Sequence, residues 1–255
     1  MKSDYKAKFA ILKKIQKPLV IQNLRIPKPN DYQLLIKIKY SYICGSQLNE
    51  INGNKGYDKF LPHTLGHEAS GEVLKVGKKV NNFKRGDKVI LSWIKRSGKD
   101  SSNPFYLDDT NNVINSGHVS TFSRMSLVSK SRVYKIPKKM PMDLAALFGC
   151  AIPTGFGIIF KHVKKIKKNE FVGVYGTGGV GMMSIIALKS LGIKNIYAID
   201  KNKENLNIAT KFGCKKIYSL DSFNKEIMNS KINKKLIKYN IEISGNKRMM
   251  EMAIK

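Results

Sequence analysis

The chain has 255 residues, of which 42% are hydrophobic and 25% charged. That is enough apolar material for one large domain or two ordinary ones, and it excludes global disorder. No apolar run approaches the roughly 20 residues of a membrane-spanning helix, and the first residues lack an uninterrupted apolar signal region. We therefore expect a soluble, cytoplasmic protein that does not associate with membranes.

The charge balance is strongly basic. Lys and Arg number 47 against 18 Asp and Glu, a formal net charge of +29, which would ordinarily suggest binding to nucleic acid or another polyanion. Only six of these cations are arginines, and the lysines are spread along the whole chain. Because arginine is the residue best suited to phosphate and base contacts, we interpret the excess as a lysine-rich bias and expect no specific nucleic-acid partner.

The first part of the chain is predicted to be rich in β-strands. Apolar and polar residues alternate over residues 33–40, which indicates a half-buried strand. Residues 71–76 and 87–93 read as further short strands, and turn residues separate them. Residues 95–117 are polar, so we expect a loop there.

After Pro141 the pattern changes to that of an α/β domain. Helices and short buried strands are expected in the following segments: helices at 142–148, 154–163, 182–191 and 204–212, and strands at 171–175, 195–200, 216–220 and 241–244. Strands that alternate with helices predict a parallel, doubly wound sheet. We thus expect two domains, a β-rich one over residues 1–150 and an α/β one over residues 151–255.

A glycine-rich turn joins the first strand of the α/β part to the helix after it. The turn fits the pattern G-x-G-x-x-G and consists of Gly176, Thr177, Gly178, Gly179, Val180 and Gly181. Its first glycine allows a tight turn, the second lets the backbone approach a pyrophosphate, and the third allows close packing of helix and strand.

Asp200 ends the next strand and is placed to bond a ribose 2′-hydroxyl. A carboxylate there repels a 2′-phosphate and favours NAD over NADP, although Lys201 and Lys203 follow it. We predict that the glycine-rich turn, Asp200 and Lys201 bind NAD.

The chain has three cysteines, Cys44, Cys150 and Cys214. A small, odd number of cysteines argues against a disulfide framework. Cys44 and Cys150 suggest a metal site together with His67. Two thiolates and an imidazole from distant segments, with a fourth position open, form the ligand set of a catalytic zinc. Cys214 is expected to be a packed thiol.

Several motifs resemble, in order, those of the zinc-containing alcohol dehydrogenases of the medium-chain dehydrogenase/reductase superfamily. Gly66-His67-Glu68, with Gly71, Gly77 and Val80, matches the family's zinc signature, and the further matches are Cys44-Gly45-Ser46, residues 83–89, Gly149-Cys150 and the glycine-rich turn. The resemblance covers nearly the whole chain. It implies a chaperonin-10-like catalytic domain joined to a Rossmann domain, with substrate and nicotinamide meeting between them.

The resemblance also implies roles for single residues. Cys44, His67 and Cys150 match the catalytic zinc ligands, Glu68 the acid that can take the fourth position transiently, and Ser46 the hydroxyl that relays the alcohol proton. Zinc lowers the pKa of a bound alcohol, hydride passes to the nicotinamide, and the proton leaves through Ser46. We expect an alcohol or polyol as the substrate.

Three departures from the family pattern bear on this expectation. Gln47 stands where the family usually has an aspartate that orients the metal-bound histidine. Asn49 replaces a histidine that completes the proton relay in some members. The lobe with four cysteines for a structural zinc is absent, since residues 95–117 contain no cysteine, so we expect one zinc per chain.

Only four strands of the expected doubly wound sheet precede Lys255, whereas such a sheet normally has six. We expect a fragment or truncated gene product, with a compact natural variant as the alternative. Family members form homo-oligomers through the last strand of this sheet, so we expect that interface to be missing and the chain to be poorly active.

Two other functions remain open. A zinc-free quinone or enoyl reductase of the same superfamily would need no metal ligands, which Cys44, His67 and Cys150 speak against. A truncated non-catalytic or polyanion-binding relative would agree with the charge and the short sheet. Trp93 fits a pocket wall and a core position equally well.

Overall fold

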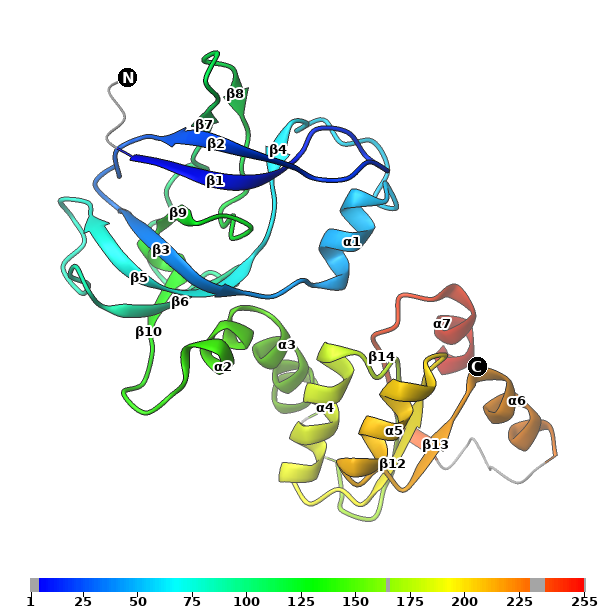
Figure 1. Ribbon diagram of the computed structural model, residues 1–255. Helices are drawn as coiled ribbons and strands as arrows, with labels where there is room; N and C mark the ends of the chain where they lie inside the picture. Colours follow the sequence, from blue (N-terminus) through cyan, green and yellow to red (C-terminus); the bar gives the residue numbers. More distant parts are fainter. Residues whose placement is uncertain (1–4, 164–165, 230–236, 255) are drawn as a thin grey trace. The chain divides into compact units, whose positions relative to one another are not determined.

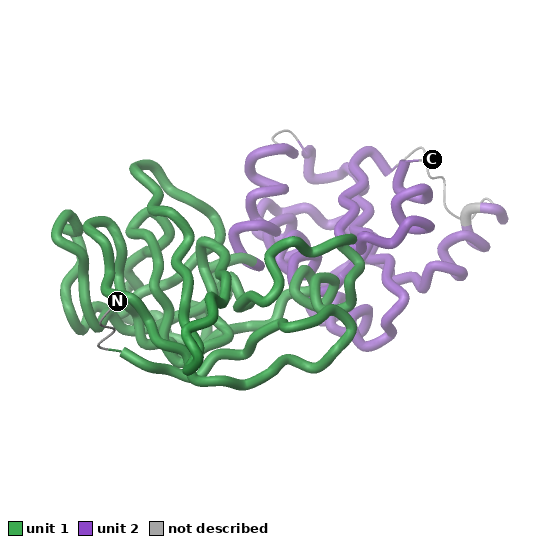
Figure 2. Tube along the Cα trace, turned by 90° about the horizontal axis from the view of Figure 1, so that it is seen from above, with its two compact units in different colours: residues 1–150 green, residues 151–255 purple. Residues whose placement is uncertain are grey.

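The computed structural model describes residues 5–163, 166–229 and 237–254. It divides into two units, residues 1–150 and residues 151–255, which Figure 2 shows in green and purple. The first unit holds two antiparallel five-stranded sheets, and the second holds a parallel four-stranded sheet with helices (Figure 1). The predicted succession of a β-rich and an α/β fold is therefore confirmed.

The strands of the first unit pair in the orders β4-β1-β2-β7-β8 and β10-β6-β5-β3-β9. Their bounds are β1 (Tyr5–Leu12), β2 (Val20–Ile26), β3 (Gln33–Ser41), β4 (His63–Thr64), β5 (Glu68–Val76), β6 (Lys88–Ser92), β7 (Tyr106–Leu107), β8 (Val113–Ile114), β9 (Met125–Ser129) and β10 (Val133–Lys135). The three strands expected from the sequence correspond to β3, β5 and β6.

Strand β3 joins the cores of both sheets because its first half is buried on both faces. Leu34 and Ile36 belong to one core cluster, whereas Leu35 belongs to another with Phe9 and Leu24. All five side chains are at most 1% exposed, and full burial of a side chain of this size contributes about 1.5–3 kcal/mol. The expected half-buried alternation holds only for the second half of β3.

The expectation that residues 95–117 form a loop is wrong in part. A short hairpin, β7 and β8, lies within this segment and pairs with β2 through Leu107 and Arg25. Tyr106 is fully buried, with its ring centroid 4.5 Å from that of Phe9, and its hydroxyl accepts a hydrogen bond from the backbone N–H of Leu127. Strands of two residues are too short to show a period in sequence, and this single buried tyrosine anchors the hairpin.

An ion pair fixes the start of the same segment. The guanidinium of Arg132 donates to Asp100 Oδ2 from Nε at 3.0 Å and from Nη2 at 2.7 Å, and the Ser131 hydroxyl donates to Oδ1 at 2.5 Å. Arg132 also donates to the backbone carbonyl of Trp93. Burial raises the pKa of Asp100, but the hydrogen bonds from Arg132 and Ser131 outweigh it and hold that pKa at about 2.

The first unit ends in helix α2 (Met142–Ala146) and a 3₁₀ turn, Leu147–Gly149, which lies against the second sheet. Helix α1 (Gly45–Ile51) follows β3. In the described residues no single helix is long and apolar enough to cross a membrane. The bent pair Met142–Gly149 and Ala151–His162 meets that test on length and composition alone.

The second unit is a parallel sheet in the order β13-β12-β11-β14. Its strands are β11 (Phe171–Tyr175), β12 (Asn195–Ile199), β13 (Lys216–Tyr218) and β14 (Ile237–Glu242), and its helices are α3 (Ala151–Gly157), continued by a π-helical turn at Ile158–His162, α4 (Gly179–Ser190), α5 (Lys203–Lys211), α6 (Leu220–Met228) and α7 (Lys247–Ile254). One core cluster joins the sheet to α4 and α5, and another joins it to α6 and α7. The sheet is therefore doubly wound, as predicted.

Replacing Asp100 by Asn should lower the free energy of unfolding of the first unit by about 2 kcal/mol at pH 7, because Arg132 would lose its charged partner while its side chain stays 9% exposed. The native pKa lies below the unfolded value, so this stabilisation is present above about pH 4 and is lost as the pH falls towards 2. Urea unfolding between pH 3 and 7 measures it. Asp109→Asn is the control, since Asp109 is 61% exposed and pairs only at the surface with Lys6.

Candidate functional site

The structure brings together the three predicted zinc ligands, which come from three separate segments of the first unit. Cys44 is the residue before α1, His67 lies between β4 and β5, and Cys150 follows the 3₁₀ turn. The two sulfurs and a ring nitrogen of His67 all lie within 4.8 Å of one another. Strand β3 ends at Ser41, and Cys44 is the N-cap residue of helix α1.

The two ring nitrogens of His67 have different surroundings. The side-chain amide of Gln47, which is 4% exposed, contacts Nδ1, and its Oε1 accepts a hydrogen bond from the backbone N–H of Cys44 at 3.2 Å. Nε2 is buried, and within the described residues it has no hydrogen-bond partner. A buried polar atom without a partner is costly, and a metal ion next to two sulfurs would satisfy it. The donor set therefore fits zinc.

The surroundings of Cys44 favour the thiolate form of its side chain. Interaction with Cys150, followed by that with His67, lowers the pKa of the Cys44 thiol far below its usual value. Hydrogen bonding from Ser46 adds a smaller contribution to the same lowering of the pKa. A thiolate is the form of cysteine that binds metal. Ser46 lies two residues after Cys44 in the first turn of α1, and its role in a proton relay stays a prediction.

Cys150 reaches the site because the residue before it is glycine. A Cβ on Gly149 would lie 2.4 Å from the carbonyl oxygen of Leu91 and 2.6 Å from Cβ of Glu68. The buried hydroxyl of Ser92 donates to the carbonyl of Gly149 at 2.7 Å. The turn thus lies directly on β5 and β6. Glu68, which is 2% exposed, is part of this contact, next to the ligand His67.

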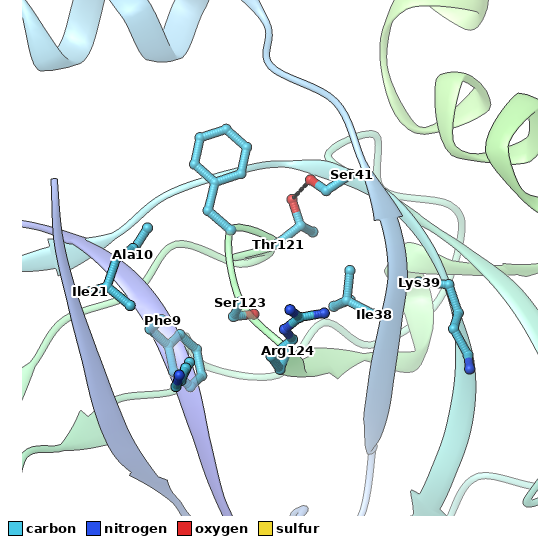
Figure 3. A pocket seen from close by; sticks show the side chains of 11 residues that line it. Phe9, Ala10, Ile21, Ile38, Lys39, Ser41, Thr121, Ser123 and Arg124 are labelled. Carbon is cyan, nitrogen blue, oxygen red and sulfur yellow. Dashed lines mark hydrogen bonds between the residues drawn. The ribbon is translucent and has the colours of Figure 1, made fainter.

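The loop that carries His67 is held from its other side. Gly66 has φ +92°, and a Cβ there would lie 2.4 Å from the Thr121 hydroxyl, so only glycine fits. The hydroxyls of Ser41 and Thr121 lie 2.8 Å apart and both bond to the carbonyl oxygen of Glu68. Figure 3 shows these two side chains on the wall of a surface hollow, which contains none of the three ligands.

Trp93 lies beside the ligands, not in the core. Its ring centroid is 6.4 Å from that of His67 and 6.2 Å from that of His118, and the side chain is 51% exposed. Burial, with the charge of Arg132, lowers the pKa of His118, which favours its neutral form. No local pattern indicates that His118 belongs near the candidate site, because only the fold places it next to Trp93.

In the second unit, the three glycines of the G-x-G-x-x-G turn differ in what they touch. Gly176 has φ +90°, and a Cβ there would lie 2.7 Å from the backbone nitrogen of Ser244. A Cβ on Gly181 would lie 1.9 Å from the carbonyl oxygen of Gly176. Gly178 is exposed and has nothing in the described part of the chain within 4 Å of such a Cβ. Packing explains the first and third glycines, whereas packing within the described chain does not require the second.

Asp200 is 7% exposed and is already engaged by the protein. Its Oδ2 accepts hydrogen bonds from the backbone N–H of Thr177 at 2.6 Å and from the Thr177 hydroxyl at 3.0 Å, and its Oδ1 accepts from the N–H of Asn202 at 2.8 Å. The carboxylate therefore shapes the glycine-rich turn in addition to any contact with a ribose. Gly179 and Val180 begin α4, and Lys201 is exposed beyond β12.

Replacing Gly149 by Ala should move Cys150 away from the other ligands, because the new Cβ would meet the backbone of β6. We expect the free energy of unfolding to fall by about 1–3 kcal/mol and the zinc affinity to fall about tenfold or more. Gly157→Ala in α3 is the matched control, since nothing described lies within 4 Å of its Cβ. Chelator competition measures the zinc affinity, and equal affinities for the two variants would contradict the role given to Gly149.

Two family models match the chain. One, described as the alcohol dehydrogenase GroES-like domain, matches residues 30–138, and the other, described as zinc-binding dehydrogenase, matches residues 179–255.

Solved structures share the fold. An alcohol dehydrogenase zinc-binding domain protein from Burkholderia ambifaria has a TM-score of 0.85 at 21% identity, over 98% of this chain and 74% of that one. Benzyl alcohol dehydrogenase from Acinetobacter calcoaceticus has a TM-score of 0.84 at 23% identity, over 98% and 74%. CAD from Helicobacter pylori, solved in complex with NADP(H), has a TM-score of 0.69 at 23% identity, over 84% and 64%. The chain belongs to the alcohol dehydrogenase family of the medium-chain dehydrogenase/reductase superfamily.

Proposed function

We propose that this member of the family is a zinc-dependent oxidoreductase that transfers hydride between an alcohol or polyol, or the matching aldehyde or ketone, and NAD. The observation that carries the proposal is the convergence of ligand atoms from Cys44, His67 and Cys150 within 4.8 Å, together with a buried His67 Nε2 that has no hydrogen-bond partner among the described residues. Neither a zinc-free reductase nor a polyanion-binding protein requires two cysteines and a histidine to converge in this way.

Zinc bound by these residues would supply the Lewis acidity that lowers the pKa of an alcohol. The chain's own residues hold the ligands and move the proton. Ser46 lies in the first turn of α1, two residues after Cys44, so its hydroxyl is near enough to the metal position to accept a proton from a substrate hydroxyl held there. Asn49 is exposed and cannot titrate, so the proton passes from Ser46 to water.

Gln47 distinguishes this site from one with an aspartate in the same place. A carboxylate behind a ligating histidine raises the basicity of the imidazole. The neutral amide of Gln47 contacts Nδ1 of His67 and lacks that effect, so we expect the metal to keep more of its charge for the substrate. Metal binding at Nε2 requires the proton on Nδ1, with the amide oxygen of Gln47 turned to accept it. The exposed ring of Trp93 gives the substrate side an apolar wall.

For the cofactor we favour NAD because a carboxylate at Asp200 disfavours a 2′-phosphate. The hydrogen bonds that Asp200 accepts from Thr177 hold that negative charge in place at the end of β12. We further propose a cytoplasmic protein whose partner is a small alcohol or polyol, with no specific nucleic-acid or membrane partner. The family's usual homo-oligomer interface is not proposed for this chain.

The proposal predicts at least one zinc per chain retained through dialysis, binding of NADH, and oxidation of at least one member of an alcohol and polyol panel. Cys44→Ser should abolish the retention of one zinc per chain. Ser46→Ala should keep zinc but lower kcat about 100-fold. Elemental analysis, fluorescence titration and absorbance of NADH measure these three outcomes. Reduction of quinones or enones by a zinc-free chain would favour the alternative reductase, and salt-sensitive polyanion binding without zinc or NADH would favour the non-catalytic relative.

Two glycine variants test the dinucleotide site separately from the metal. Gly178→Ala should leave thermal stability unchanged but weaken NADH binding at least tenfold, because its Cβ would occupy space that the described chain leaves open to a pyrophosphate. Gly181→Ala should destabilise the second unit even without cofactor, because its Cβ would meet the Gly176 carbonyl. Thermal unfolding and fluorescence titration measure both. Unchanged NADH affinity in Gly178→Ala would remove the support for binding at this turn.

A further inference from the structure

A second group of metal-binding side chains lies in the first unit, apart from the zinc ligands. Glu50 lies near the end of α1, Asp58 in the loop after it, and His63 in β4. One ligand atom from each lies within 4.8 Å of the other two. None of the three belongs to the family motifs in the sequence, and the proposed reaction does not use them.

The orientation of His63 is the first argument. The residue is 6% exposed. Its Nδ1 faces the backbone carbonyl of Thr64 at 3.2 Å, whereas its Nε2 faces Asp58 Oδ2 at 2.7 Å and Glu50 Oε1 at 3.7 Å. A ligating histidine typically donates one ring N–H to a backbone carbonyl and keeps the other nitrogen for the metal. In the tautomer with the proton on Nδ1, Nε2 directs its lone pair at two carboxylate oxygens and is free to bind a cation between them.

The spacing is the second argument. Two atoms about 2.0–2.1 Å from a tetrahedral zinc lie roughly 3.3 Å apart. The distances of 2.7 and 3.7 Å from Nε2 fall on either side of that value, so shifts of a few tenths of an ångström suffice. Lys55 does not block the position, because its Nζ bonds to Oε2 of Glu50 at 2.9 Å and leaves Oε1 towards His63.

The rigidity of the frame is the third argument. The backbone N–H of Phe60 donates to Asp58 Oδ1 at 2.9 Å, which leaves Oδ2 directed at His63. Asn115 holds the same loop by donating to the carbonyl of Phe60 at 2.8 Å and, from its backbone, to that of Pro62 at 3.0 Å. The Asp58 carboxylate is 14% exposed and the Glu50 carboxylate 27% exposed.

We propose that Glu50, Asp58 and His63 form a second cation site that binds a divalent transition-metal ion such as Zn²⁺. One imidazole and two carboxylates suit zinc and its neighbours, whereas magnesium and calcium prefer oxygen ligands alone. The expectation of a single zinc followed from the absence of a cysteine lobe. This site needs no cysteine, so the proposal departs from that expectation.

A cation here would connect the end of α1 to β4. Helix α1 carries Ser46 and Gln47 in its first turn and Glu50 in its last. His63 pairs with Leu12 of β1 and lies four residues before His67. The bound ion would therefore stabilise the helix that supports the zinc ligands without contacting the substrate, and it should raise the thermal stability of the chain.

The test removes the first site and titrates the second. The full 255-residue untagged chain with Cys44→Ser and Cys150→Ser is titrated with Zn²⁺ by calorimetry at pH 7.5. We expect saturable binding of one ion per chain and a rise in Tm. Adding Glu50→Gln should weaken binding at least tenfold, whereas the control Asp109→Asn should leave it unchanged. Glu50 is partly exposed and Gln keeps its shape, so the fold should survive, as circular dichroism will show.

A second measurement covers the case in which the double cysteine variant does not fold. Co²⁺ added to the metal-free parent chain should fill the cysteine site with strong thiolate-to-cobalt absorption. A second equivalent should then bind without adding to that absorption, and it should be lost in Glu50→Gln. Absence of a second saturable equivalent would overturn the proposal and leave a proton shared by His63 and Asp58. Equal binding by Glu50→Gln and Asp109→Asn would overturn it too. Neither outcome touches the first zinc site.

Discussion

The candidate zinc site depends on one close approach between main-chain segments. The turn before Cys150 lies on strands β5 and β6 with no side chain between them, because position 149 is glycine and Ser92 bonds to its carbonyl. Strand β5 starts at Glu68, immediately after His67. The same contact therefore fixes two of the three ligands relative to each other, and a single added methyl group is enough to separate them.

The third candidate ligand, Cys44, caps helix α1, and the two ends of this helix contact different groups of residues. At the first turn of α1, the side chain of Gln47 accepts a hydrogen bond from the backbone of Cys44 and contacts the ring of His67. At the last turn, Glu50 faces His63. A helix of this length is marginal by itself, so its position relies on what holds each end. This is why a cation at the far end would matter for the reacting end.

In the second unit, hydrogen bonds connect Asp200 with the glycine-rich turn, two features that are separate in the sequence. The carboxylate of Asp200 bonds to the backbone and hydroxyl of Thr177, so the end of β12 braces the turn after β11. A charge fixed in this way is preorganised for a ligand and does not have to be ordered on binding. Gly178 lies in the same turn, and no described atom of the unit lies within 4 Å of the position that a Cβ there would take. Space next to the turn is therefore open to a ligand.

The sequence by itself determined the fold class, three strands of the first unit, the four strands of the second unit, the glycine-rich turn and the three candidate metal ligands. The hydrophobic period, the spacing of glycines and the residue types that can bind a metal are local properties of the sequence, so they can be recognised without a structure. Only the tertiary structure decided that Trp93 borders His67, that Asp200 is bonded to Thr177, that Tyr106 anchors a hairpin in a polar segment, and that Glu50, Asp58 and His63 converge. Each of these depends on distances between side chains from different segments, and those distances follow from how the layers pack, which no local pattern records.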